Sequence, residues 1–168
     1  MSEGLDVIIV DDDEAACESL AEIIGRFYSW GNVYVFTDDE EAGVYCLNRN
    51  TGIAIFVVDV FLKDKSGFMF LDSIAGKYEA LYEDTIIVTG HSNDDIVDMC
   101  VAAGIHHLLE KPIRAHALQL AVRSIAFKYL RFADRLLNSH AFHDHYYKLL
   151  DATRSWKQPG KEAPRNCR

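Results

Sequence analysis

Five short apolar runs, separated by segments of helical periodicity, constrain the fold of this chain more than any other feature. The runs are rich in β-branched residues and lack strict alternation of polar and apolar positions. They are Val7–Val10, Val33–Phe36, Ile53–Val58, Ile86–Val88 and Ile105–Leu109. Such runs are typical of strands that are buried on both faces of a parallel sheet. The intervening segments carry apolar residues three and four positions apart, which predicts amphipathic helices.

The alternation of strands and helices predicts a doubly wound α/β fold with a five-stranded parallel sheet. Right-handed crossover connections place the functional loops of such a sheet at the carboxyl ends of its strands. Residues that carry chemistry are therefore expected at the strand ends.

Acidic residues follow two of the predicted strands. The first strand leads directly into Asp11, Asp12 and Asp13, and the third leads into Asp59. Carboxylates that crowd together repel one another, and a hard divalent cation such as Mg²⁺ can neutralise them. The first three aspartates can also be explained as a helix N-cap and an acidic first turn. That explanation does not extend to Asp59, which follows six apolar residues.

Two further strand ends carry polar residues. Thr89 ends the fourth strand, and its hydroxyl can donate a hydrogen bond to a phosphoryl oxygen. Lys111 follows the fifth strand and precedes Pro112, and its ammonium can pair with a carboxylate or a phosphate. Each residue alone is a weak signal, but together the strand-end residues indicate phosphoryl chemistry.

The order and spacing of these segments resemble the receiver domain of bacterial two-component response regulators (CheY-like). The matching segments are Val10–Asp13, Val57–Asp59, Gly67, Val88–Ser92, Ala103–Gly104 and Lys111–Pro112. The resemblance extends from residue 5 to about residue 130. It implies a flavodoxin-like sheet of strand order 2-1-3-4-5, followed here by an extended C-terminal helical region.

The resemblance also implies a phosphoacceptor and a magnesium site. Asp59 would accept a phosphoryl group from a histidine kinase or a phosphotransfer protein. Asp11, Asp12 and Asp59 would bind Mg²⁺, together with the backbone carbonyl of Phe61. The domain would then catalyse its own phosphorylation and dephosphorylation, rather than act as a classical enzyme, and the Phe61 side chain would modulate hydrolysis.

Other positions take roles from the same resemblance. Thr89 and Lys111 would contact the phosphoryl group, so they join Asp59 as the catalytic residues. Gly90 and His91 would modulate the access of water, and we predict that His91 influences the lifetime of the phosphorylated state. The switch position, where the family usually has an aromatic residue, is Leu108. We therefore expect the conventional aromatic switch to be replaced by another signalling route.

The sequence bears on two alternative functions. A phosphatase of the dehalogenase type needs a second aspartate as general acid two residues after the nucleophile, and Phe61 occupies that position. The second alternative is the N-terminal regulatory fragment of a larger signalling enzyme, such as a cyclic-dinucleotide phosphodiesterase or a hybrid histidine kinase. The sequence leaves that alternative open.

The C-terminal third differs from the rest in charge and in periodicity. Residues 1–112 contain 22 acidic and 6 basic residues, whereas residues 113–168 contain 4 acidic and 11 basic residues. A heptad-like seam suggests a long fifth helix; it consists of Leu118, Val122, Ile125, Tyr129, Phe132 and Leu136. We predict a receiver domain over 1–130, a helical extension over 131–157 and a disordered tail over 158–168. We expect a homodimer through the fifth helix and its extension, with folding back onto the receiver as the alternative.

Composition also predicts location and partners. No apolar run is long enough to span a membrane, and the first residues lack a signal-peptide pattern. The four cysteines are scattered, which favours free thiols and a cytoplasmic protein. The acidic receiver would repel nucleic acid, and the basic residues of the extension are dispersed, so we expect no nucleic-acid or membrane partner. The role of the three C-terminal histidines, His140, His143 and His145, is left open.

Overall fold

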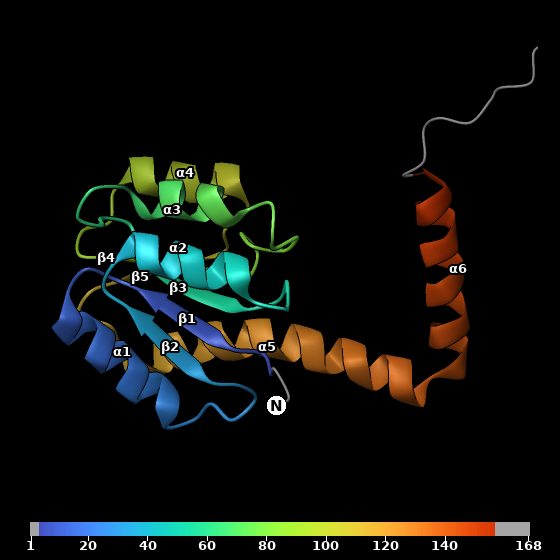
Figure 1. Ribbon diagram of the computed structural model, residues 1–168. Helices are drawn as coiled ribbons and strands as arrows, with labels where there is room; N and C mark the ends of the chain where they lie inside the picture. Colours follow the sequence, from blue (N-terminus) through green and yellow to red (C-terminus); the bar gives the residue numbers. More distant parts are fainter. Residues whose placement is uncertain (1–3, 157–168) are drawn as a thin grey trace, which may run out of the picture. The chain divides into compact units, whose positions relative to one another are not determined.

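The computed structural model describes residues 4–156 and contains one parallel sheet of five strands (Figure 1). The strands are β1 (Val7–Val10), β2 (Val33–Phe36), β3 (Ile55–Asp59), β4 (Thr85–Thr89) and β5 (His107–Glu110). Their spatial order is β2-β1-β3-β4-β5, and every neighbouring pair is parallel. This order confirms the predicted flavodoxin-like sheet.

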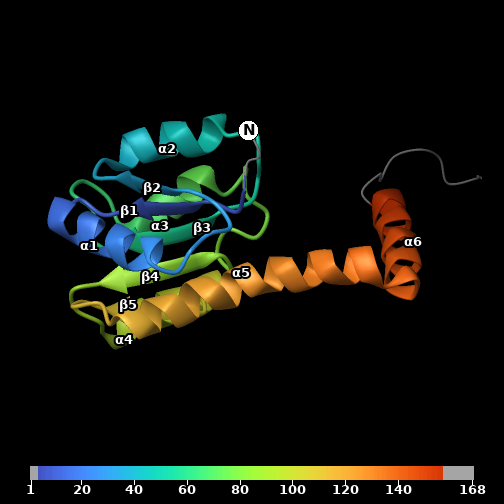
Figure 2. The same cartoon turned by 90° about the horizontal axis from the view of Figure 1, so that it is seen from below.

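Helices connect the strands and cover both faces of the sheet. They are α1 (Glu14–Gly25), α2 (Asp39–Asn48), α3 (Gly67–Ile74), α4 (Asp94–Ala103), α5 (Ala115–Asn138) and α6 (His140–Trp156). Figures 1 and 2 show α1 and the start of α5 on one face, and α2, α3 and α4 on the other. The predicted C-terminal helical region is therefore present as the end of α5 and as α6.

Side-chain oxygens set the starts of the first four helices. In each case the N-cap side chain accepts a hydrogen bond from a backbone N–H of the first turn, which satisfies a donor that has no partner inside the helix. The four N-caps are Asp13, Asp38, Ser66 and Asn93. The capping interpretation of the first acidic run is correct for Asp13, and it leaves Asp11 for another role.

The core consists of the central strands and the helix faces that pack on them. All residues of β1, β3 and β4 are buried, whereas the edge strands β2 and β5 are only partly buried. Ile8, Phe56 and Ile87 pack with residues of α2, α3 and α4 in one continuous cluster. Burial on both faces explains why the central strands lack polar alternation.

Two strands begin later than the apolar runs predict. Ile105 is not part of β5, because Gly104 ends α4 in the left-handed conformation (φ 78°) and the Ile105 amide donates to the Cys100 carbonyl (2.9 Å). This is a helix C-cap in which the N–H of the residue after the glycine still donates to a carbonyl of the helix. Ile53 is 44% exposed, and its amide donates to the Thr51 hydroxyl before β3 begins at Ile55.

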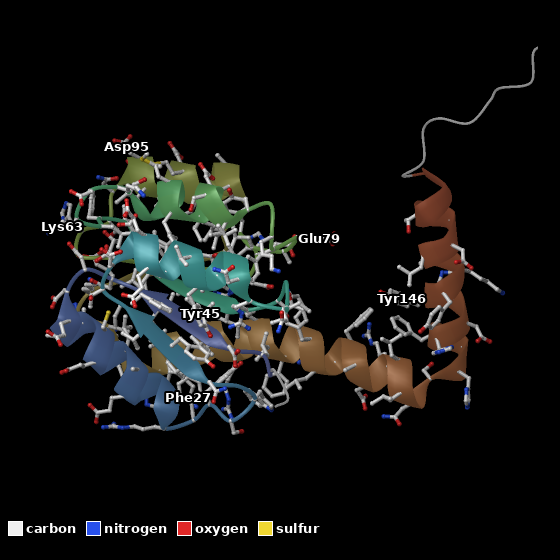
Figure 3. The ribbon with its side chains drawn as sticks, in the orientation of Figure 1. Phe27, Tyr45, Lys63, Glu79, Asp95 and Tyr146 are labelled. Carbon is white, nitrogen blue, oxygen red and sulfur yellow. The ribbon has the colours of Figure 1, made fainter. Side chains whose placement is uncertain are left out.

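The chain separates into two compact units, the first ending at Ala126 and the second beginning at Phe127. α5 belongs to both, and its buried residues all lie in the first unit, from Leu118 to Ala126. In the second unit the ring of Phe132 meets the rings of Phe142 and Tyr146 edge-on, with centroid distances of 5.9 and 5.0 Å. Tyr146 is labelled beside α6 in Figure 3.

Two further predictions concern thiols and membranes. Cys17, Cys46 and Cys100 are buried free thiols, as expected, whereas Cys167 and the predicted tail over 158–168 lie outside the described residues. Within residues 4–156, no helix has the length and apolar character needed to cross a bilayer.

Candidate functional site

Carboxylates from two strands meet at the carboxyl edge of the sheet. β1 and β3 are adjacent and pair in register from Val7 with Ile55 to Val10 with Val58. The residues that follow, Asp11 and Asp59, therefore lie side by side. Together with Asp12 they place one carboxylate oxygen each within 4.8 Å of the others. Asp11 and Asp59 are buried, whereas Asp12 is exposed, so solvent reaches the cluster at Asp12.

Lys111 lies between the two buried carboxylates. Its Nζ is 2.6 Å from Asp11 Oδ2 and 2.5 Å from Asp59 Oδ2. Its backbone N–H donates to the Thr89 carbonyl (2.8 Å), which holds the end of β5 against β4, and its peptide bond to Pro112 is cis. One ammonium thus joins strand ends that lie far apart in the sequence.

The site perturbs the ionisation of these groups. Burial raises the pKa of the Asp11 carboxyl above its ordinary value, and the neighbouring Asp59 charge adds to the rise, although hydrogen bonds from Lys111 and the Asp13 amide oppose it. Burial acts to lower the pKa of Lys111, but hydrogen bonds and charge attraction from Asp11 and Asp59 outweigh it and raise that pKa. The raised pKa favours the protonated, cationic form of Lys111 at this site.

Backbone amides fix the orientation of both buried carboxylates. Asp59 Oδ1 accepts from the Phe61 N–H (2.9 Å), and Asp11 Oδ1 accepts from the Asp13 N–H (3.0 Å). In each residue Oδ1 is held by the amide two positions later, and Oδ2 faces Lys111. The Oδ2 atoms are therefore presented together in a fixed direction.

Gly67 lets the start of α3 approach the backbone of Asp59. A Cβ at Gly67 would lie 2.1 Å from the Asp59 carbonyl oxygen, which is far inside van der Waals contact. The Gly67 N–H also donates to the Val60 carbonyl (2.8 Å). The spacing of eight residues between Asp59 and Gly67 therefore has a steric reason, because only glycine permits this close approach.

The remaining predicted residues differ in burial and in their contacts. Thr89 is fully buried at the end of β4, and its hydroxyl hydrogen-bonds with the backbone of His91. The side chains of Phe61 and His91 are exposed, as is Gly90. Leu108, at the switch position, is half-buried and packs against the core.

The sequence model of the response regulator receiver domain matches residues 7–123, which is most of the chain. The chain belongs to this family. It is a receiver domain of two-component signalling. Receiver domains generally use Mg²⁺, interact with histidine kinases or phosphotransfer proteins, and often dimerise.

One curated relative and two solved structures illustrate the similarity. The C4-dicarboxylate transport transcriptional regulatory protein DctR of Rhodobacter capsulatus is 26% identical over 129 residues, which are 76% of this chain and 64% of that protein. A signal receiver domain from Vibrio parahaemolyticus has 22% identity and a TM-score of 0.65, with 83% of this chain and all of that chain covered. The beryllofluoride-activated NtrC4 receiver domain dimer has 24% identity and a TM-score of 0.64, covering 74% and 98% of the two chains. The structures establish a shared fold.

The receiver contains contacts near the site that sequence reasoning missed. The Ser92 hydroxyl donates to the Glu110 carboxylate, which joins the loop after β4 to the end of β5. Lys65, in the loop after β3, pairs with Asp39 at the start of α2 (2.9 Å). The partners are separated by 18 and 26 positions, and no local pattern connects them. A groove of about 710 Å³ along α2 contains none of the clustered carboxylates, so we place the receiver's site at the acidic cluster.

Proposed function

We propose that this receiver accepts a phosphoryl group on Asp59 Oδ2 in a reaction supported by Mg²⁺. The observation that carries the proposal is the contact of one ammonium, Lys111 Nζ, with Oδ2 of both Asp11 and Asp59. Asp59 Oδ2 would attack phosphorus in line, forming a P–O bond while the bond to the donor breaks and the leaving group takes the electron pair. With acetyl phosphate the leaving group is acetate, and with a phosphohistidine it is the imidazole.

The neighbouring residues of the chain support this reaction. Lys111 would stabilise the negative charge that develops on the phosphoryl oxygens. The Phe61 N–H keeps Asp59 Oδ1 in place, so that Oδ2 remains the attacking atom. Thr89 would donate its hydroxyl hydrogen to a phosphoryl oxygen once it has left the His91 carbonyl. The phosphoryl oxygens would thus face a cation and a hydroxyl donor from two different strands.

The donor set fits a divalent magnesium ion. Three carboxylates and one ammonium sum to a formal charge of −2, which a divalent cation neutralises. The ligands would be Asp11, Asp12, Asp59 and the Phe61 backbone carbonyl, all oxygen donors of the kind that Mg²⁺ prefers. When bound, Mg²⁺ would neutralise carboxylate and phosphoryl charge at the site. The exposed side of Asp12 leaves room for the water ligands that Mg²⁺ retains.

Labelling by acetyl phosphate tests the proposal directly. In the presence of Mg²⁺, we expect intact-mass measurement to show one added phosphoryl group per chain, and we expect chelation of Mg²⁺ to remove nearly all of it. The reason is that the carboxylate cluster would otherwise repel the anionic donor. Peptide mapping should place the label at Asp59. Equal labelling after chelation, or a label elsewhere, would contradict the proposal.

Phe61, Gly90 and His91 would set the lifetime of the phosphorylated form, and other elements would carry its output. His91, Gly90 and Phe61 are exposed beside the site, where they can admit or exclude the hydrolytic water. Leu108 has no aromatic ring, so it cannot act as the rotating aromatic switch of the family. Signalling would instead use the loop after β4, α4 or the long α5. The upstream partner would be a cognate histidine kinase or phosphotransfer protein, and the receiver itself would act in the cytoplasm.

We further propose that the second unit mediates homodimerisation. None of its described side chains, from Phe127 to Thr153, is buried. Yet it carries many large apolar residues: Phe127, Tyr129, Leu130, Phe132, Leu136, Leu137, Phe142, Tyr146, Tyr147, Leu149 and Leu150. A pair of helices this small does not build a sufficient core alone, and helical propensity by itself contributes little. A second copy would cover these faces and form a bundle of helices.

The aromatic cluster of Phe132 in α5 with Phe142 and Tyr146 in α6 is the centre of the proposed interface. The side chain of Phe132 is 38% exposed although its ring contacts Phe142 and Tyr146. Partly exposed aromatic clusters of this kind are typical of interface hot spots. The structure of the beryllofluoride-activated NtrC4 receiver is described as a dimer, which supports self-association of a chain from this family.

Replacing Phe132 with glutamate is expected to dissociate the dimer. Burying a carboxylate at the centre of an apolar interface should weaken self-association at least about 30-fold, as for other interface hot spots. The measurement is molar mass by light scattering over a range of concentrations, with and without Mg²⁺ and beryllofluoride. Val44→Glu, at a 62% exposed position of α2, is the matched control and should leave the mass unchanged. A wild-type protein that stays monomeric in all conditions would contradict the proposal.

A further inference from the structure

The side chains of Thr89, Ser92 and Asn93 hold the loop between β4 and α4 by hydrogen bonds. Thr89 Oγ1 donates to the His91 carbonyl (3.0 Å) and accepts from the His91 N–H (3.2 Å). Asn93 Oδ1 accepts from the Ile96 N–H (2.9 Å) and caps α4. Between these two turns, the Ser92 hydroxyl donates to the Glu110 carboxylate. The Ser92 hydrogen bond differs from the hydrogen bonds of Thr89 and Asn93, because its partner belongs to another strand, β5.

Glu110 lies beside the residue that the loop must reposition. In the ladder between β4 and β5, Glu110 is the register partner of Thr89. The next backbone amide, that of Lys111, donates to the Thr89 carbonyl. The backbone of Thr89 is therefore fixed against β5, and Ser92 is held to the same strand end by its side chain. The segment between these two attachments consists of residues 90 and 91 only.

The hydroxyl of Thr89 has one hydrogen, which it donates to the His91 carbonyl. A donation to a phosphoryl oxygen on Asp59 requires Thr89 Oγ1 to release the His91 carbonyl. The turn from Thr89 to His91 then opens, and Ser92, the following residue, shifts with it. The contact between Ser92 and Glu110 opposes that shift. The same contact therefore stabilises the conformation in which Thr89 is engaged with its own loop.

We propose that Ser92 and Glu110 form a latch that holds the β4–α4 loop in the form without a phosphoryl group. They are positioning residues that act through Thr89, and among the described residues neither contacts Asp11, Asp12 or Asp59. This inference rests on the proposed acceptance of a phosphoryl group by Asp59. The latch would oppose phosphoryl binding and would substitute in part for the aromatic switch that Leu108 cannot provide.

The test compares the affinity for beryllofluoride, a phosphoryl mimic, in Ser92→Ala, Glu110→Ala and the double variant. With saturating Mg²⁺, each single variant should bind beryllofluoride roughly three- to tenfold more tightly than the wild type, since one hydrogen bond of the competing form is lost. The double variant should match the singles, because all three lack the same contact. Affinity for Mg²⁺ alone should not change. Titrations followed by amide NMR shifts report both affinities.

Ser19→Ala and Glu18→Ala, at exposed positions of α1, are matched controls and should bind beryllofluoride as the wild type does. Unchanged or weaker binding in the single variants would overturn the latch. So would effects that add in the double variant, or a loss of Mg²⁺ affinity, because these outcomes indicate independent or general structural damage. A wild-type protein that fails to bind beryllofluoride would instead overturn the proposed function itself.

Discussion

Replacement of Asp59 with asparagine is expected to abolish phosphoryl acceptance from acetyl phosphate, with a loss of at least about 1,000-fold in the labelling rate. The asparagine oxygen can still accept from the Phe61 N–H, so the local fold should persist. The attacking anionic oxygen and its ion pair with Lys111 are lost, however. A neutral amide is a far weaker nucleophile than a carboxylate, and removal of a nucleophile has the largest effect of any single change to a site.

Intact-mass measurement over time, with Mg²⁺ in excess, gives the labelling rate of each variant. Asp64→Asn makes the same chemical change at an exposed position of the same β3–α3 loop, and it should be labelled as the wild type is. Persistent labelling of the Asp59 variant at a rate close to that of the wild type would show that another residue accepts the phosphoryl group.

Replacement of Arg49 with methionine is expected to lower the free energy of unfolding by about 3–5 kcal/mol. Arg49 follows α2, and its Nη2 lies 2.9 Å from Asp6 Oδ2; their side chains are only 6% and 5% exposed. The Arg49 nitrogens have no well-aligned hydrogen-bond acceptor, so the pair acts mainly through charge. Methionine fills much of the same volume but leaves the Asp6 carboxylate buried without its cation. Urea unfolding, followed by circular dichroism, measures the change.

Two further variants separate charge from packing. Asp6→Asn keeps an oxygen that accepts from the Asn32 N–H, so the double variant with Arg49→Met should regain a large part of the lost stability. Arg26→Met removes the same residue type from the exposed pair with Glu22, and it should cost about 0.5 kcal/mol or less. Equal losses in Arg26→Met and Arg49→Met would contradict a special role of the buried pair.

The sequence indicated the candidate site well, because parallel strands bring their carboxyl ends to one edge. Asp11 and Asp59 each follow an apolar run, and the register of β1 with β3 places them together as expected. Lys111 and Thr89 were predicted for the same reason, from the ends of β5 and β4. The sequence did not predict that Lys111 contacts both carboxylates at once. That contact depends on the order of the strands and on the conformation of a flexible side chain.

The sequence was less informative wherever a contact joins distant segments. The seam from Leu118 to Leu136 predicts one continuous helix, which α5 confirms, but its burial ends at Ala126. Periodicity shows which face of a helix is apolar, but not how far a sheet extends to cover that face. An apolar run likewise does not show where a strand begins. The apolar Ile105 precedes β5, and its N–H donates to the Cys100 carbonyl at the end of α4.

By itself, the sequence determined the element types, the parallel sheet and the residues at its carboxyl edge, because these follow from periodicity and from residues adjacent in the chain. Only the tertiary structure decided which distant side chains meet. The contact of Ser92 with Glu110 and the buried pair of Asp6 with Arg49 both depend on crossover geometry. Such contacts arise when the strands and helices pack, and no local pattern records them.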